Sequence, residues 1–352
     1  MKYFPISNTL FSKNRKHFVE NMLDNSIAFF NSNDCYPVSA DTTLPFEQHR
    51  DLFYLSGINQ EETVLLIYKY NDSNYEEVLF LTKPNDLLTH WEGERLNEEK
   101  AYSISGIKTV YWLEQLDVVV KKIMQNVKIL YLNKNEHYRA KVETETREKR
   151  FNDWLKKEYP NKDLMGSNSI LQKLRSVKSP IEIELIQKAC DITEKGFRRI
   201  LNFVKPGVWE YEIEAEFSHE FLKNRSKKFA YSPIIASGKN STILHYIENN
   251  NQCLEGDVLL LDVGAEYANY SSDMTRTIPV SGKFSNRQKS IYNSVLHVKN
   301  EATKLLRPGI LWKDHFKEVG KIMSSELLKL GLLSKSDIQN QTKENPAFKK
   351  YF

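Results

Sequence analysis

The sequence has few cysteines and little net charge, and each shortage excludes a class of protein. Its 352 residues include only Cys35, Cys190 and Cys253, which lack the short pair spacing of a disulfide framework or a metal site. They predict a reducing compartment, with each thiol packed as a small apolar group. A net charge of +4 without a basic stripe predicts no nucleic-acid partner.

Long apolar runs are absent as well. No run approaches the ~20 residues that cross a bilayer. The first residues, Met1–Pro5, lead into no apolar core with a cleavage site, so no signal peptide is predicted. These absences predict a cytoplasmic protein without a membrane partner. The composition, 40% hydrophobic and 27% charged, is that of an ordinary globular protein, and the length suggests two domains.

The first part of the chain alternates apolar runs with helical spacing. Buried strands are predicted at 64–68, 78–81 and 129–132, and helical patterns around 10–24 and 113–125 separate them. This alternation predicts a small α/β domain over residues 1–145. A polar stretch follows, and we expect a connector at 146–178.

A second domain is expected over 179–352, and its first signal is a capping box. Ser179–Glu182 supplies an N-cap hydroxyl, a proline at the first helical position and a glutamate three residues on. The apolar spacing that follows is helical, and Lys205–Gly207 predicts the end of the helix.

The same order of features occurs twice. A helix, the Lys205–Gly207 stop, Trp209 and another helix are followed about a hundred residues later by a helix from Ser285, an Arg307–Gly309 stop, Trp312 and a helix. This repetition predicts an internal duplication. The first copy continues into strands expected at 231–237, 243–247, 258–266 and 270–280. The second copy should do likewise, but the chain ends at Phe352, so we expect the second half-sheet to be missing.

Two aspartates follow in this stretch of strands. The apolar run Val258–Leu261 predicts a strand buried on both faces, with Asp262 at its end. A tight turn centred near Tyr267 and Ala268 would place Asp262 opposite Asp273 on the next strand. Facing carboxylates repel unless a cation or a shared proton lies between them, and a pair of divalent metal ions satisfies this need. The alternative is structural: Asp262 caps a turn and Asp273 pairs with Arg276.

His245 favours the metal interpretation. A small-residue turn at 237–242 and a short strand ending in His245 would bring an imidazole close to the aspartate hairpin. A lone histidine is more often a structural residue, but one beside paired carboxylates is a better candidate for a catalytic role.

These motifs together resemble the aminopeptidase P family, within the creatinase, prolidase and methionine aminopeptidase superfamily. The resemblance covers nearly the whole chain, and its motifs occur in order. They are Gln48–Gly57, Trp91–Arg95, Ser176–Pro180, Ala236–Asn240, Leu244–Tyr246, Leu261–Gly264 and Asp273–Thr277.

The resemblance implies an α/β (α+β) chain in which a small α/β domain precedes an incomplete pita-bread catalytic domain. It implies two divalent metal ions, which are usually manganese in this family, with Asp262 on one ion and Asp273 bridging both. His245 would steady the substrate or the tetrahedral intermediate. The implied substrate is a peptide with proline in the second position, and the implied assembly is a homo-oligomer.

The sequence departs from the family after Asp273. The family's remaining ligands, one histidine and two glutamates, belong to the second half-sheet, and His297 and His315 lie in expected helices. We therefore expect the 352-residue chain to be a truncated form with little activity and the intact protein to be active. Open alternatives are a prolidase-type dipeptidase, a metal-free creatinase-like hydrolase, and, if Phe352 is the true end, a non-catalytic pita-bread binding module such as histone chaperones use.

Overall fold

The computed structural model describes residues 3–85, 89–91, 93–342 and 345–351. Glu92 of the expected Trp91–Arg95 motif and the terminal Phe352 lie outside them. The chain forms two compact units. The first combines Met1–Asp191 with Asn224–Lys227 and Ala265–Ser272, and the second combines Ile192–Lys223, Lys228–Gly264 and Asp273–Phe352.

A six-stranded mixed sheet forms the centre of the first unit. Its order is β6 (Thr109–Trp112), β5 (Asn74–Leu81), β4 (Val64–Asn71), β1 (Ser26–Asn31), β7 (Ile129–Leu132) and β8 (Asp163–Gly166). The three strands expected from apolar runs are confirmed as β4, β5 and β7. The central strand, β1, pairs antiparallel with β4 and parallel with β7, and all six of its residues are buried.

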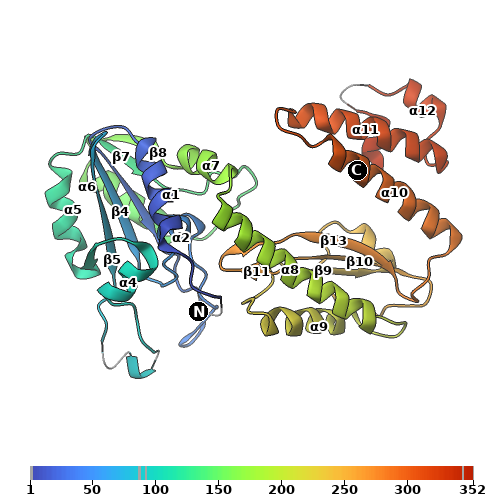
Figure 1. The fold of residues 1–352 in the computed structure, drawn as a ribbon, viewed down its shortest axis with the longest axis horizontal. Helices are drawn as coiled ribbons and strands as arrows, with labels where there is room; N and C mark the ends of the chain where they lie inside the picture. Colours follow the sequence, from blue (N-terminus) through green and yellow to red (C-terminus); the bar gives the residue numbers. More distant parts are fainter. Residues whose placement is uncertain (1–2, 86–88, 92, 343–344, 352) are drawn as a thin grey trace. The chain divides into compact units, whose positions relative to one another are not determined.

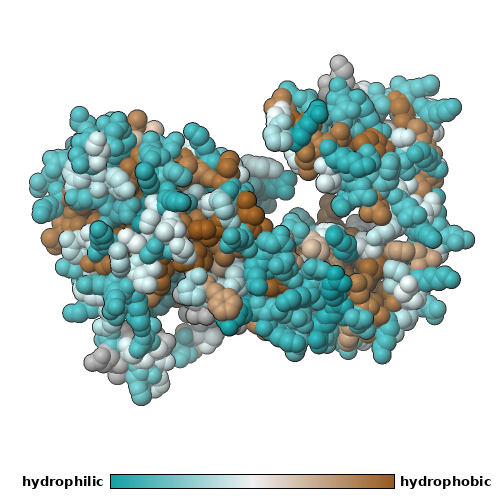
Figure 2. Space-filling view, in the orientation of Figure 1, coloured by the Kyte–Doolittle hydropathy of each residue, from teal (hydrophilic) through white to brown (hydrophobic). Residues whose placement is uncertain are grey.

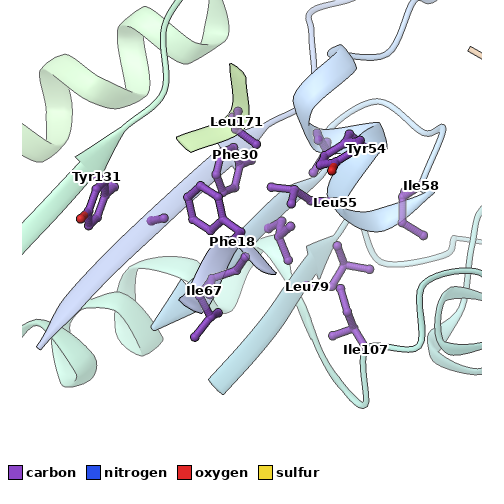
Figure 3. Packing of buried hydrophobic residues seen from close by; sticks show 14 of the residues in the cluster. Phe18, Phe30, Tyr54, Leu55, Ile58, Ile67, Leu79, Ile107, Tyr131 and Leu171 are labelled. Carbon is purple, nitrogen blue, oxygen red and sulfur yellow. The ribbon is translucent and has the colours of Figure 1, made fainter. Parts of the chain in front are cut away.

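Helices cover both faces of this sheet (Figure 1). One face packs against α1 (Asn8–Glu20), α2 (Arg50–Ser56), α4 (Glu98–Ser105) and α7 (Asn168–Ser176), and the other against α5 (Leu116–Met124) and α6 (Arg147–Glu158). Figure 3 shows the first of these layers, where Phe30 of β1 meets Phe18 of α1 edge to face at 5.3 Å. The apolar spacing of each helix matches the face that it buries.

Residues 146–178, expected to be a connector, instead belong to this unit. They form α6, β8 and α7, and β8 pairs in parallel with β7. Leu155 of α6 and Leu171 of α7 are buried in the two core layers. The expectation was wrong because it rested on the polar composition of the stretch. A few apolar residues on one face are enough for a helix to pack against the sheet.

Two helices begin the second half of the chain. The capping box predicted at Ser179 is confirmed, since Ser179 N donates to Glu182 Oε2 at 2.8 Å and Glu182 N donates to Ser179 Oγ at 3.4 Å. It opens α8 (Pro180–Phe203), and α9 (Glu210–Lys223) follows. Gly196 lets α9 approach closely, because a Cβ there would lie 2.8 Å from the rings of Phe217 and Phe221.

The second unit contains a three-stranded antiparallel sheet in the order β13 (Met274–Pro279), β10 (Val258–Val263), β9 (Ile234–Ser237). The prediction of a strand at 243–247 is wrong. A 3-10 helix, η2 (Gly238–Thr242), and a turn occupy this region. Gly238 starts it at φ +52°, and Ser241 Oγ closes it by donating to the Gly238 carbonyl at 2.7 Å.

The duplicated helix pair is confirmed. α10 (Asn286–Leu305) starts at a capping box on Ser285, and α11 (Trp312–Lys329) follows. Gly207 and Gly309 lie in the turn after the first helix of each copy, with φ of +96° and +88°, which favour glycine. The remaining short elements are β2 (Pro37–Ser39), β3 (Thr42–Thr43), η1 (Leu113–Gln115), α12 (Lys335–Gln339) and η3 (Ala347–Tyr351).

The three cysteines are free thiols. Cys253 is buried as expected, but Cys35 is exposed, so the expectation of a packed thiol is wrong there. Figure 2 shows a mostly hydrophilic surface over α8 and hydrophobic residues reaching the surface around α10 and α11.

Among the described residues, no helix is both long enough and apolar enough for a membrane crossing.

Candidate metal centre

A short hairpin joins the two aspartate-bearing strands. It consists of β11 (Glu266–Tyr267) and β12 (Tyr270–Ser271), connected by Ala268 and Asn269. Both connecting residues have positive φ, +52° and +65°. Two such residues in succession make a type I′ turn, whose twist matches that of paired strands.

This turn sets the register of the aspartates. Asp262 faces Thr275, and Val263 faces Met274, so the expected direct pairing of Asp262 with Asp273 is wrong. The expected turn was centred one residue too early, which shifts each facing partner by two positions. A shift of two keeps every side chain on its own face, because side chains alternate with a period of two. Asp262 and Asp273 are therefore diagonal neighbours on one face.

The Tyr231 hydroxyl brings the two carboxylates together. Its Oη lies 2.6 Å from Asp262 Oδ1 and 3.0 Å from Asp273 Oδ1. Asp262 and Tyr231 are half-buried, and Asp273 is exposed. No local pattern signals this contact, because Tyr231 lies 31 residues before Asp262.

The bridging hydroxyl cannot satisfy both carboxylates at once. It carries one hydrogen, so the second carboxylate oxygen needs a further proton or a cation. Burial, followed by the hydrogen bond to Asp262, raises the pKa of Tyr231 far above its ordinary value. The phenol therefore stays protonated, and the arrangement has a net demand for positive charge.

The structural alternative for Asp273 finds no support. Arg276 donates through Nη1 to the Thr275 carbonyl at 2.7 Å. Within the described part of the chain, Asp273 forms no ion pair with Arg276.

His245 lies on the exposed turn after η2. In the described residues it forms no hydrogen bond to either aspartate. Its neighbour Tyr246 is buried against Ile234, Ala236 and Leu260. Leu260 lies on the same face of β10 as Asp262, so the turn that carries His245 packs on the aspartate face of the sheet.

A buried glutamate that no sequence pattern singled out, Glu210, fixes this turn. Glu210, 0% exposed, accepts from the N and Oγ of Ser237, both at 2.7 Å, and from Asn251 N at 2.9 Å. It also accepts from Tyr246 Oη at 2.7 Å, and burial raises the pKa of Tyr246 to about 12. Four donors satisfy one buried carboxylate, which makes Glu210 a structural anchor.

The later histidines serve the helix pair. His315 Nε2 is 2.9 Å from the Ala302 carbonyl, which links α11 to α10, and His297 Nε2 lies 3.9 Å from Glu326. The described residues contain no group of three or more histidine, cysteine, aspartate or glutamate side chains able to hold a metal ion. Asp262 and Asp273 therefore supply ligands of the right kind but not a closed cage.

Two family models match the chain. Residues 11–131 match the aminopeptidase P N-terminal domain, and residues 184–347 match metallopeptidase family M24. The chain is 32% identical to the Xaa-Pro aminopeptidase of Escherichia coli over 342 residues, covering 97% of this chain and 77% of the relative.

Solved structures agree with these matches. A Bacillus anthracis protein provisionally described as an aminopeptidase P superposes with a TM-score of 0.89 at 32% identity, over 95% of this chain and 80% of the other. Zinc-substituted Escherichia coli aminopeptidase P in complex with product superposes with a TM-score of 0.84 at 30% identity, over 94% and 76%.

Proposed function

Because this chain belongs to the aminopeptidase P group of metallopeptidase family M24, we propose that it serves as a metal-dependent aminopeptidase that releases the N-terminal residue before a proline. The observation that carries the chemistry is the pair of carboxylates, Asp262 and Asp273, held on one sheet face around the Tyr231 hydroxyl. The amide nitrogen of an Xaa-Pro bond carries no hydrogen, whereas the amide of any other peptide bond presents an N–H.

The donors present suit a hard divalent cation. Carboxylate oxygens are the ligands that manganese and magnesium prefer, and the pair already demands positive charge. We assign Asp262 to one metal ion and Asp273 to a position between two, with manganese as the metal. By resemblance, a histidine and two glutamates complete the site. Bound metal would polarise the scissile carbonyl and lower the pKa of a water ligand.

The chain's own residues have separate tasks around that site. Tyr231 holds the two carboxylates at a fixed separation. Glu210 fixes the turn through Tyr246, and His245 on this turn would donate to the substrate or to the developing oxyanion. A homo-oligomer remains part of the proposal, as does a cytoplasmic location.

The test uses the product of the complete gene, assayed with manganese on an Xaa-Pro-Xaa tripeptide and on an Xaa-Pro dipeptide. Asp262→Asn removes a charged ligand while keeping side-chain size, so kcat/KM and bound metal should each fall at least about a hundredfold. Asp314→Asn, on the first turn of α11, is the matched control and should retain both.

Cleavage of the tripeptide supports the aminopeptidase, whereas cleavage of the dipeptide alone would favour the prolidase-type alternative. Wild-type activity in Asp262→Asn would remove this aspartate from the site. A complete product that binds no metal would favour the non-catalytic binding module.

A further inference from the structure

The hairpin between the two aspartates belongs to the first unit, although both aspartates belong to the second. Asp262 precedes Ala265 by three positions, and Asp273 directly follows Ser272. Whatever fixes the segment 265–272 therefore fixes the backbone on the inner side of each carboxylate.

Arg50 contacts this hairpin through its guanidinium group. It is the first residue of α2, and its Nη2 lies 2.5 Å from Glu266 Oε2. Its Nη1 donates to Asn269 Oδ1 in the turn itself. The side chain of Glu266 is only 6% exposed, so the guanidinium pairs with a carboxylate that is largely shielded from water.

Other hydrogen bonds hold the rest of the hairpin. Phe4 N donates to Tyr267 Oη at 3.1 Å, and Ser226 Oγ donates to the Glu266 carbonyl at 2.7 Å. Tyr270 Oη donates to Glu182 Oε1 at 3.1 Å. Arg50 differs from these anchors because one cationic group contacts the hairpin at two places, at Glu266 of β11 and at Asn269 of the turn.

We propose that Arg50 is a positioning residue for the metal centre: by clamping Glu266 and Asn269 it sets the separation of Asp262 and Asp273. The inference rests on the proposed metal function. It predicts that a residue of the N-terminal unit, which touches neither carboxylate, controls metal affinity.

The test reads the aspartate pair directly, through the Tyr231 hydroxyl. The 352-residue chain is labelled with ¹³Cζ-tyrosine, and the Tyr231 signal is assigned by its loss in Tyr231→Phe. Its shift reports the hydrogen bonds to the two carboxylates and needs no metal. Arg50→Met should move or broaden this signal, whereas Arg50→Lys, which keeps the charge, should largely restore it.

Two further variants isolate the contact. Asn269→Gly removes the acceptor but suits the positive φ of the turn, so it should shift the Tyr231 signal less than Arg50→Met and stay folded. Arg150→Met breaks a comparable ion pair of the same unit, with Asp34 at 2.7 Å, and should leave the signal unchanged. If Arg50→Met does not fold, the signals of Arg50→Lys and Asn269→Gly decide whether Arg50 positions the two carboxylates.

Manganese titration provides the second readout, because bound Mn²⁺ broadens the Tyr231 signal. The concentration for half-broadening should rise about tenfold in Arg50→Met, as expected for a residue that orients metal ligands. An unchanged shift and titration in Arg50→Met, or an equal effect of Arg150→Met, overturns the proposal. If Mn²⁺ broadens Tyr231 in no variant, the metal assignment fails for this chain, while the metal-free shift still decides the role of Arg50.

Discussion

The central strands of the two units differ in how they are covered. All six residues of β1 are buried, because helices pack on both faces of the six-stranded sheet. In β10 burial alternates: Leu259, Leu261 and Val263 are fully buried, whereas the other face is only half-buried. That open face carries Asp262. A sheet whose core lies on one side alone leaves its other side available for ligands.

The open face continues into a groove. A cavity of about 550 Å³ lies between β13, the start of β10 and helix α10, lined mainly by apolar side chains that include Ile291, Tyr292 and Val295. The expectation that Val258–Leu261 is buried on both faces is therefore wrong, since Val258 lines the cavity and Leu260, packed against Tyr246, is only half-buried. An apolar run in the sequence therefore indicates a strand but not how many of its faces are covered.

The largest expected effect comes from a substitution in the six-stranded sheet, which helices cover on both faces. Phe30→Ala should lower the free energy of unfolding of the first unit by about 3–5 kcal/mol, because it removes a ring from a layer with little room to collapse. Urea unfolding followed by circular dichroism measures this change. Tyr138→Ala, at an 82% exposed position, is the control, and an equal loss there would contradict the packing argument.

Two neighbouring leucines test the singly covered sheet. Leu261→Ala should cost about 2–4 kcal/mol, since its side chain is fully buried, and Leu260→Ala on the open face about 1 kcal/mol. The same unfolding measurement, followed through the second unit's transition, compares them. Equal costs would mean that both faces of β10 are covered in solution.

The third test concerns a buried acid in the first unit, and its effect is spread over several pH units. Glu148 accepts from the N and Nδ2 of Asn31 at 3.1 and 3.0 Å, and burial raises its pKa from 4.5 to about 8. Because the folded state binds this proton more tightly, the stabilisation is complete below pH 4.5 and is lost as pH rises toward 8. Asp51 adds to the shift and Arg147 opposes it.

Relative to Glu148→Gln, the free energy of unfolding of the wild type should fall by about 1 kcal/mol per pH unit between pH 5 and 8. Denaturant midpoints at several pH values measure this slope. Glu158→Gln, exposed on the same helix, should not alter it. Parallel pH profiles for the wild type and Glu148→Gln would show that Glu148 is ionised in the fold.

Local signals explain what the sequence predicted well. The Ser179 capping box, the helix start at Ser285 and the stops at Gly207 and Gly309 depend on a few neighbouring residues, so they appear in the structure as expected. The candidate site was harder to predict from the sequence. The aspartates were chosen from spacing, but Tyr231 and Glu210 act through contacts over 31 to 42 positions, which no local pattern reveals.

Short-range patterns were enough to predict strands β4, β5 and β7, the helix from Ser179, the repeated helix pair and the choice of two aspartates, because capping, turn chemistry and apolar periodicity are properties of short segments. Long-range packing set the register of β10 and β13, the hydroxyl shared by Asp262 and Asp273, and the membership of segment 265–272 in the first unit. These depend on which distant groups pack together, and packing is settled by the whole chain.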